Sequence, residues 1–507
     1  MDENVVFNST TAESSGNQVS GNVEQPVNRG PQIIDLNQAG TGQAAETMND
    51  QIASEESEVQ PEQVPPSEPP PPIHSSFFGG RIFKIIIGLV VLIIVIFLVV
   101  LLIPKGKDNK KAKLVWWGLW EDQAVMQPLI ADFQKQHPNI TVEYVKQDPK
   151  QYREKLLTRI KNGTGPDIFR FHNTWVPMIS DVLLPLSSDV ITPEAFKKDY
   201  YPVMQKDLIQ NGAIYGVPMG VDTLGLFVNT EIFKAGGKQP PQTWEDFVSE
   251  ASDLTVKDEN GKIKTAGAAL GTYGNITHAP DILAMLFLQQ GVDLKKFPEQ
   301  VDKETEALNF YTQFGKGDKN VWDSTLDESI LSFARGNLAM YIGFSWDIFR
   351  IQALNKDLAF STHPVPQLVG QRSNLASYWV EGISSKSQNQ NAALLFMQYL
   401  AKKETAQKFY SSVSKTRAFG EPYARVDLAN SLKDNPILFP FVSELETANS
   451  SVFASDTNDS EGGINFMSNT YLGDSINAIV NDNSSPQTVI ETLDKGIDQV
   501  YQKYGIQ

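Results

Sequence analysis

Residues 113–175 read KLVWWGLWEDQAVMQPLIADFQKQHPNITVEYVKQDPKQYREKLLTRIKNGTGPDIFRFHNTW, and this stretch decides the fold. Its apolar residues change their spacing in a regular order. An unbroken apolar run at 114–117 predicts a buried strand, and apolar residues at helical spacing over 125–133 predict a helix. Strict alternation of apolar and polar residues over 140–144 predicts a second strand.

A second helix and a third strand complete the stretch. Asp148 and Pro149 are residue types typical of a helix cap and a first helical position, and apolar positions over 152–160 continue the helical spacing. Gly165-Pro166 ends that helix and leads into a strand at 167–171. Strands that alternate with helices in this order favour a parallel, doubly wound α/β sheet.

A separate stretch, IIIGLVVLIIVIFLVVLLI from Ile85 to Ile103, has no charged or polar side chain. A helix of this length covers roughly 28 Å, close to the hydrocarbon core of a bilayer. A buried core helix would keep a polar stripe, and a cleaved signal peptide would have a shorter apolar region near residue 1. We therefore predict one transmembrane helix within residues 81–104, which contacts the lipid bilayer through Ile85–Ile103.

The predicted anchor divides the chain into segments of different composition. Residues 1–80 are rich in Asn, Gln, Ser, Glu and Pro, which predicts a disordered, acidic and proline-rich tail. Residues 105–112 form a lysine-rich linker. Residues 113–507 form a body that is long enough for two domains.

The composition excludes several classes of protein. The chain has 507 residues, a formal net charge of −17 and no cysteine, so it has no disulfide, thiolate metal site or lipid-bearing cysteine. An acidic balance argues against nucleic-acid binding, which needs a basic surface. The five histidines lack metal-ligand spacing and no glycine-rich phosphate loop is present, so no metal or cofactor is expected. The acidic patch Asp456, Asp459 and Glu461 is interpreted as a solvated loop.

Two predicted loops should meet at one edge of the sheet, because ligands of open α/β sheets bind beyond the carboxyl ends of the strands. Aromatic faces suit the apolar face of a sugar ring, while carboxylates and amides bind its hydroxyls. The alternative for each tryptophan is core packing. The shared chemistry of the loops favours a common pocket, and its candidate residues are Trp120, Glu121, Phe171, Asn173, Thr174 and Trp175.

Four short motifs carry a resemblance to a known family through their order and spacing. They are Gly165-Pro166-Asp167-Ile168, Tyr215-Gly216-Val217-Pro218 leading through Asp222 to Asn229, Pro241-Gln242-Thr243-Trp244, and Gly336-Asn337-Leu338-Ala339-Met340-Tyr341 leading to Trp346. From Lys113 to about Tyr504 the chain resembles the extracellular solute-binding proteins of ABC importers, in the sugar-binding branch that includes maltose-binding protein.

The resemblance implies a protein that is not an enzyme and that has the type II periplasmic-binding-protein fold. In that fold two doubly wound α/β lobes are joined by a hinge and hold the solute between them. The implied hinge crossings lie near Asp222–Leu226, Trp379–Ile383 and Arg417–Tyr423. The first lobe would contain about 113–222 and 382–420, and the second lobe about 223–378 and 421–507.

The resemblance also implies which residues contact the solute. These are Trp120 and Glu121 after the first strand, Phe171, Thr174 and Trp175 after the third, Asp222 at the first crossing, and Trp346 and Tyr471 on the second lobe. Trp379 and Glu381 are added because of their position at the hinge. The charged pairs of the maltose-type loops are altered here, so maltodextrin is not implied.

The expected function is the capture of a carbohydrate for an ABC permease by hinge closure, with no bond broken. One alternative is a glycoside hydrolase in which Asp222 and Glu381 flank the scissile bond. Another alternative is a ligand-sensing surface protein with the same fold. Neighbouring permease genes or a neighbouring kinase gene would separate transport from sensing.

The charges beside the predicted anchor conflict with this function. Five lysines over 105–113 favour a cytoplasmic body by the positive-inside rule, whereas import requires a body outside the cytoplasm. A folded domain of several hundred residues translocates largely regardless of charge. We therefore expect a single-pass protein of the cell membrane with a cytoplasmic tail and an extracytoplasmic C-terminal domain.

Overall fold

The computed structural model describes residues 111–317, 319–368 and 372–506, and these belong to one compact unit. The predicted disordered tail, the predicted span Ile85–Ile103 and all but the end of the lysine-rich linker lie outside the described residues. Within the described ranges, no helix combines the length and apolar character that a membrane crossing requires.

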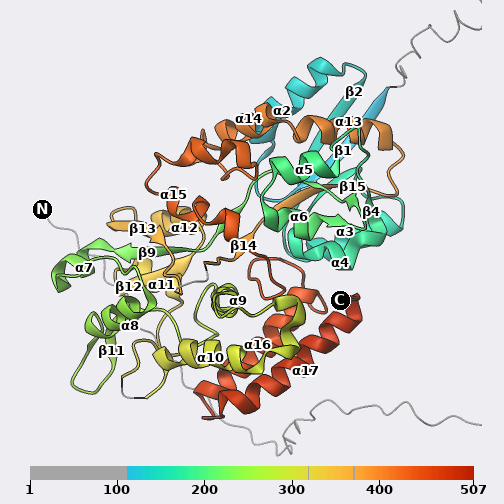
Figure 1. Ribbon diagram of the computed structural model, residues 1–507. Helices are drawn as coiled ribbons and strands as arrows, with labels where there is room; N and C mark the ends of the chain where they lie inside the picture. The colour runs from blue at the N-terminus through green and yellow to red at the C-terminus, as the bar shows by residue number, and fades with distance from the viewer. Residues whose placement is uncertain (1–110, 318, 369–371, 507) are drawn as a thin grey trace, which may run out of the picture. The chain divides into compact units, whose positions relative to one another are not determined.

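Two β-sheets organise these residues (Figure 1), and the first has the strand order β2-β1-β3-β15-β4 with β7 beside β15. β1 runs parallel to β2 and β3, whereas β15 is antiparallel to β3, β4 and β7. The strands are β1 (Ala112–Gly118), β2 (Ile140–Lys146), β3 (Ile168–His172), β4 (Leu183–Leu184), β7 (Val217–Pro218) and β15 (Trp379–Ser384).

The predicted alternation of strands and helices is confirmed, because α2 (Gln123–Gln136) and α3 (Tyr152–Lys161) connect the three parallel strands. α3 begins at Tyr152 and not at Pro149, since Gln151 has a φ of 55° and interrupts the helical path. The other helices of this part are α4 (Val176–Ile179), α5 (Pro193–Asp199), α6 (Pro202–Leu208), α13 (Gln390–Leu400) and α14 (Lys403–Val413), with the 3₁₀ turns η1 (Asn173–Trp175) and η2 (Ser180–Val182) and the hairpin β5 (Ile209–Gln210) and β6 (Ala213–Ile214).

The second sheet has the order β10-β11-β12-β9-β13. It is mixed, because β9 runs antiparallel to both of its neighbours while β11 and β12 are parallel. The strands are β9 (Gly225–Asn229), β10 (Val256–Lys257), β11 (Ile263–Ala268), β12 (Leu338–Gly343) and β13 (Phe360–Pro364).

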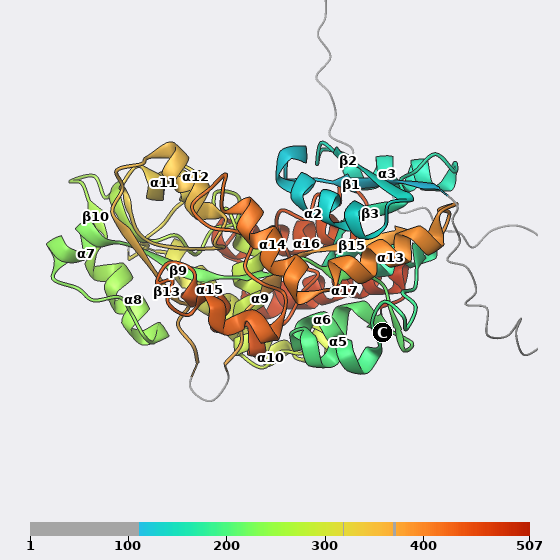
Figure 2. The ribbon, with the colours of Figure 1, turned by 90° about the horizontal axis from the view of Figure 1, so that it is seen from above.

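Helices pack around the second sheet, and α16 and α17 form the C-terminal end of the chain (Figures 1 and 2). They are α7 (Thr230–Gly236), α8 (Trp244–Asp253), α9 (Ala279–Gln289), α10 (Val301–Thr312), α11 (Ser329–Ala334), α12 (Asp347–Leu354), α15 (Phe439–Val442), α16 (Ile464–Val480) and α17 (Pro486–Tyr504), with η3 (Leu294–Glu299), η4 (Gln313–Gly315), η5 (Val426–Leu432) and η6 (Leu445–Thr447).

Two very short strands join the two sheets. β8 (Asp222–Thr223) pairs with β14 (Ala376–Ser377) in an antiparallel ribbon, and the N–H of Val221 donates to the carbonyl of Pro422 in a third adjacent segment (3.0 Å). The chain therefore passes between the sheets three times at one place, close to the predicted crossings. The middle passage occurs at 376–377, just before the predicted return at Trp379.

Each sheet has its own buried hydrophobic cluster, and we call these two parts of the body the first and second lobes. Trp116, Phe133 and Phe396 lie in the cluster of the first lobe, and Phe227 and Tyr341 lie in that of the second. Two details differ from the predicted lobe boundaries. β15 joins the first sheet from residue 379 onward, and Leu445 and Ala448 pack in the first cluster although they fall within 421–507.

Candidate functional site

A buried ionic triad lies beneath the carboxyl edge of the first sheet. Arg170 donates through Nη1 to Glu121 Oε2 (2.5 Å) and through Nε to Glu381 Oε1 (2.7 Å). Trp116 Nε1 donates to the other oxygen of Glu381 (2.7 Å). Burial raises the pKa of Glu381, and Arg170 opposes that shift. The predicted solute contacts of Glu121 and Glu381 stay predictions, and in this structure both carboxylates bind neighbouring protein groups.

The third-strand loop turns most of its side chains inward. Phe171 and Trp175 are completely buried in the first core, and the Trp175 indole N–H has no hydrogen-bond partner among the described residues. Asn173 is also buried, and its Nδ2 donates to Asp207 Oδ2 (3.0 Å). Thr174 of this loop bonds to the second lobe, because its Oγ1 donates to Asn465 Oδ1 on α16 (2.7 Å).

Aromatic side chains form a partly open surface on the first lobe. The ring of Trp379 lies edge-on to the rings of Trp120, His172 and Trp175, at centroid distances of 5.5, 5.2 and 5.6 Å. Trp120 is 41% exposed, and Trp379 is partly exposed. Trp120 and Trp379 therefore form aromatic surface at this edge, and their predicted contacts with a solute stay predictions.

A second aromatic pair lies on the second lobe, directly after β12. Phe344 and Trp346 stack at a centroid distance of 4.2 Å with an interplanar angle of 14°, and Trp346 remains partly exposed. Tyr471 lies elsewhere. Its ring packs against Gly496 between α16 and α17, and its hydroxyl contacts Gln499 Oε1 (3.4 Å).

The hinge strands connect these two aromatic surfaces through side chains. His172 contacts Ser377 Oγ of β14 through Nε2 (3.1 Å), and Ser377 is paired with Asp222 of β8. Asp222 Oδ2 accepts hydrogen bonds from the backbone N–H and the hydroxyl of Ser345 (2.8 and 2.6 Å). Burial raises the pKa of Asp222 to about 8. Asp222 therefore binds the loop between Phe344 and Trp346 to the hinge.

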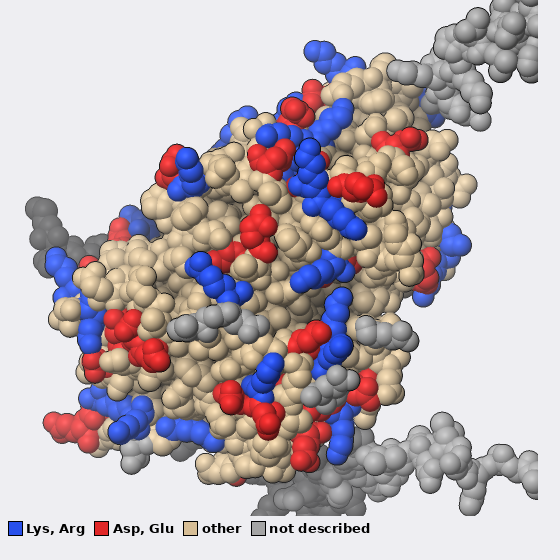
Figure 3. All heavy atoms as spheres, viewed as in Figure 1, with Lys and Arg blue, Asp and Glu red and all other residues tan. Residues whose placement is uncertain are grey.

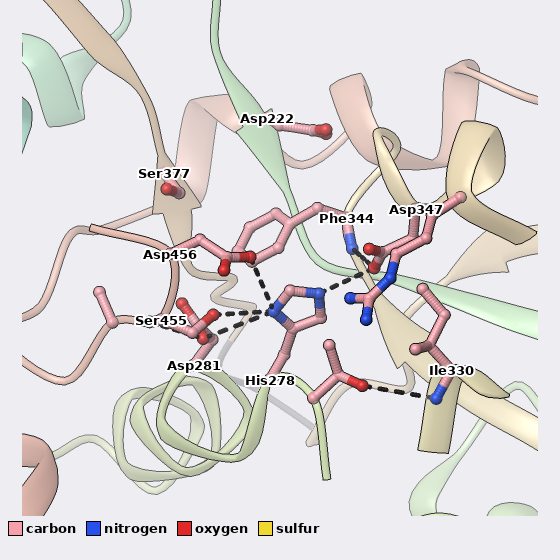
Figure 4. A network of polar contacts seen from close by, with 12 residues as sticks. Asp222, His278, Asp281, Ile330, Phe344, Asp347, Ser377, Ser455 and Asp456 are labelled. Atoms are coloured by element: carbon pink, nitrogen blue, oxygen red, sulfur yellow. Dashed lines mark hydrogen bonds and ion pairs between the residues drawn. The ribbon is translucent and has the colours of Figure 1, made fainter. Parts of the chain in front are cut away.

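A histidine-centred network, shown in Figure 4, lies next to the second aromatic pair. His278 contacts Asp347 Oδ2 through Nε2 (2.8 Å) and Ser455 Oγ through Nδ1 (2.8 Å). Asp281 and Asp456 lie 3.9 and 4.0 Å from Nδ1. Burial by itself lowers the pKa of His278, but attraction by Asp347 and the two other carboxylates outweighs burial and raises the pKa to about 9.

Sequence reasoning missed this network. His278 precedes α9, Asp347 begins α12, and Ser455 and Asp456 lie in the loop before α16, so no local spacing brings them together. Asp456 was interpreted with Asp459 and Glu461 as a solvated patch. In the structure Asp459 is buried and its carboxylate accepts from the N–H groups of Asn465 (2.6 Å) and Phe466. Among the described residues, no cluster of acidic and histidine side chains has the arrangement of a metal site.

The loop at 455–465 also touches the first lobe. Arg153 Nε on α3 donates to the carbonyl of Asp459 (2.8 Å), and the hydroxyl of Ser460 donates to Glu154 Oε2 (2.9 Å). One groove of about 790 Å³ lies between α3 and this loop, and it is lined by Lys150, Gln151, Glu154, Lys155, Thr158, Arg159, Ser460 and Glu461. A second groove of about 460 Å³ is lined by residues 454–460 together with Tyr273, Phe466, Asn469 and Thr470.

Charged groups of both signs are interspersed over the face shown in Figure 3. No extended basic area is visible on that face.

Comparisons with known proteins agree with this architecture. The family model described as "Bacterial extracellular solute-binding protein" matches residues 128–440. The multiple sugar-binding protein of Streptococcus mutans is 22% identical over 308 residues, which cover 57% of this chain and 71% of that protein.

Two solved structures share the fold at low sequence identity. The sugar-binding protein MalE of Xanthomonas citri has a TM-score of 0.62 at 21% identity, covering 77% of this chain and 98% of that chain. An ABC transporter solute-binding protein of Thermotoga lettingae, bound with α-D-tagatose, has a TM-score of 0.59 at 20% identity, covering 77% and 99%. The predicted α/β class is confirmed as a mixed α/β fold that matches solved structures of sugar-binding proteins of this type.

Proposed function

Because this chain belongs to the bacterial extracellular solute-binding proteins, we propose that it captures a carbohydrate between its two lobes and delivers it to an ABC permease. The S. mutans relative is named a multiple sugar-binding protein, and the T. lettingae structure holds a sugar. These names support a carbohydrate as the solute. Delivery would follow hinge closure, which buries the solute between the lobes.

The observation that carries this proposal is the attachment of an aromatic surface on each lobe to the same hinge. Trp379 follows β14 by two residues, and Trp346 follows Ser345, which binds Asp222 of β8. A rotation about these strands changes the separation of the two surfaces directly. Aromatic faces suit the apolar faces of sugar rings, so the pair is suited to enclosing a carbohydrate.

We infer that fewer residues contact the solute than the sequence predicted. Trp120, Trp379 and Trp346 keep exposed ring surface, and they are our primary candidates for stacking. Thr174 and Asn465 meet between the lobes and can exchange their mutual bond for bonds to hydroxyl groups. Phe171, Trp175 and Glu381 are buried in the first lobe, where they support this surface from behind.

The hydrolase alternative gains no support from the geometry. Both oxygens of Glu381 accept hydrogen bonds from Trp116 and Arg170. Asp222 Oδ1 accepts from the N–H of Thr223 (2.9 Å), and Oδ2 accepts from Ser345. A pair of glycosidase carboxyl groups must instead face the scissile bond and a water molecule. Binding without catalysis is therefore the proposed activity.

The proposed location is the outer face of the cell membrane, with Ile85–Ile103 as the anchor. Protease treatment of intact cells, or of spheroplasts where an outer membrane exists, tests this location against lysed cells. Digestion of the body in intact cells supports it. If the body is digested only after lysis, it lies in the cytoplasm. A body in that position could not capture a solute for an importer, and the proposed function would be wrong.

A thermal-shift screen of the purified protein tests the proposed function. The panel contains D-tagatose, mannobiose and maltotetraose, with amino acids and short peptides as other classes. A carbohydrate at 100-fold over its dissociation constant should stabilise the folded protein by roughly 2.7 kcal/mol. Stabilisation by peptides alone, with no response to any carbohydrate, would contradict the proposal.

A further inference from the structure

His278 connects two segments that are far apart in the sequence and adjacent in the second lobe (Figure 4). Nε2 contacts the carboxylate of Asp347, the first residue of α12 and the neighbour of Trp346. Nδ1 contacts the hydroxyl of Ser455, the neighbour of Asp456. The His278 ring also lies edge-on to Phe344 and Trp346, at centroid distances of 5.1 and 6.3 Å.

Asp456 is the member of this network that faces solvent. Its side chain is 64% exposed although it lies 4.0 Å from the His278 ring, and it lines the smaller groove together with Tyr273 and Phe466. Phe466 is 45% exposed. The groove therefore combines a carboxylate with aromatic surface, which is the chemistry that binds the hydroxyls and apolar face of a sugar.

We propose that His278 is a positioning residue that holds Trp346 and the Asp456 carboxylate together as one binding surface for the hydroxyl groups of a neutral carbohydrate. This inference rests on the proposed function. His278 itself is fully buried, so it acts through the two segments that it connects and does not contact the solute.

The contacts of His278 explain why a neutral side chain would be a poor substitute. Asp281 faces the ring from α9, Asp347 from α12 and Asp456 from the loop before α16. The hydroxyl of Tyr341 on β12 donates to the same Asp347 oxygen (2.8 Å). Three carboxylates repel one another, and a neutral ring between them would leave that repulsion uncompensated. The charged ring therefore offsets that repulsion and keeps both segments in place.

The same charges should make the groove distinguish neutral sugars from acidic sugars. The three carboxylates outnumber the single imidazolium, and the nearby Arg350 and Glu328 offset each other as an ion pair. The region around Asp456 therefore carries net negative charge. An acidic sugar would bring a further negative charge to this groove, whereas hydroxyl groups donate favourably to a carboxylate. Neutral carbohydrates are therefore expected to bind in preference to uronates.

The test uses the full chain labelled with 5-fluorotryptophan. The fluorine resonance of Trp346 is assigned by its loss in Trp346→Phe, and it is followed from pH 7 to pH 10 in the wild type and in His278→Gln. The matched control is His363→Gln, since His363 lies on β13 of the same lobe and contacts Ser361 Oγ outside this network. Affinities for D-tagatose, mannobiose, maltotetraose and D-glucuronate are measured on the same samples.

The expected result is a wild-type Trp346 resonance that moves as His278 loses its proton, and a displaced resonance without that movement in His278→Gln. Sugar affinity should fall about tenfold in His278→Gln at pH 7, in line with the loss of one buried charged hydrogen bond, and His363→Gln should match the wild type. D-glucuronate should not bind.

Three outcomes would overturn the inference. They are a Trp346 resonance that ignores pH, a His278→Gln variant that binds a neutral sugar as tightly as the wild type, and tighter binding of D-glucuronate than of neutral sugars. Asp222 also changes its charge near its pKa of about 8 and binds Ser345 next to Trp346, so the titration is repeated in Asp222→Asn. If His278→Gln fails to fold, a Trp346 resonance that ignores pH in Asp222→Asn overturns the inference, and a resonance that still moves supports it. If no panel sugar binds the wild type, the proposed function fails, while the fluorine data still decide whether His278 positions Trp346.

Discussion

Replacing Arg170 with methionine removes the cation at the centre of the buried triad. The side chain of Arg170 is 4% exposed, and those of Glu121 and Glu381 are 6% and 1% exposed. Methionine fills part of the same volume but donates no hydrogen bond. Two carboxylates would then remain in the interior without a counter-charge.

The expected cost follows from that burial. Removal of one partner of a buried ion pair typically destabilises a protein by about 3–5 kcal/mol. Arg170 serves two carboxylates, so we expect Arg170→Met to lower the free energy of unfolding by an amount at the upper end of that range. The matched control is Arg335→Met, because the Arg335–Asp327 pair is about half exposed and exposed pairs contribute at most about 1 kcal/mol.

Urea unfolding at pH 7, followed by tryptophan fluorescence, measures both variants. The pH dependence provides a second check. Burial already raises the pKa of Glu381 and Arg170 opposes that shift. Without Arg170 the pKa of Glu381 should therefore lie further above its value in the unfolded chain, so the variant should gain stability as the pH is lowered from 7 to 5. A loss below about 1 kcal/mol, or equal losses in the two variants, would refute the assignment of a structural role to the triad.

Further predictions concern the site and the hinge. Trp379→Ala should weaken carbohydrate binding about tenfold, equivalent to about 1.4 kcal/mol, while Tyr471→Phe should leave the affinity unchanged; equal affinities in titration calorimetry would remove Trp379 from the site. The pKa values of Asp222 (about 8) and His278 (about 9) in the folded protein exceed those in the unfolded chain. The folded protein therefore holds these two protons more tightly than the unfolded chain does. The free energy of unfolding should fall as the pH rises from 6.5 to 9 and both protons are lost. In urea titrations Asp222→Asn and His278→Gln should each show a smaller decrease in the free energy of unfolding over this pH range than the wild type. A wild-type stability that increases with pH over this range would contradict the raised pKa values of both groups. Arg153→Met should loosen the contact between α3 and the 455–465 loop, and X-ray scattering should then give a larger radius of gyration. Lys150→Met, at an exposed position, should leave the radius of gyration unchanged. Identical scattering of the two variants would show that Arg153 does not hold the lobes together.

The three parallel strands β1, β2 and β3 could be predicted because each strand, and each helix between them, has its own apolar periodicity. The predicted sheet was parallel throughout, and this was wrong because β15 pairs antiparallel with β3, β4 and β7. β2 alternates buried and exposed residues from Ile140 to Tyr144, and α2 buries one stripe from Val125 to Phe133. The hinge strands β8 and β14 have two residues each. Such short strands have no periodicity, so only the resemblance to a family indicated crossings in this region. The return crossing that it implied, near Trp379, lies two residues beyond β14.

Side-chain type alone did not decide which candidate residues are exposed. Trp120 and Trp175 were both predicted from the strand-end loops, yet Trp120 is exposed and Trp175 is buried in the core. Trp379 was added from its position at the hinge, and the contacts of all three residues with a solute stay predictions. A tryptophan next to a strand end can lie in the buried core or on the exposed edge of the sheet. Tertiary packing, which the local sequence does not show, decides between these two positions. The His278 network was not predictable, because its contacts link residues 69 and 177 positions apart.

The most direct test of carbohydrate capture between the lobes is a crystal structure of the protein with the panel sugar that gives the largest thermal shift. The sugar is expected to contact Trp379 or Trp120 on one side and Trp346 on the other, with its hydroxyl groups within hydrogen-bond distance of Asp456 or Asn465. A sugar bound to one lobe alone, or bound away from both aromatic surfaces, would contradict the proposed mechanism.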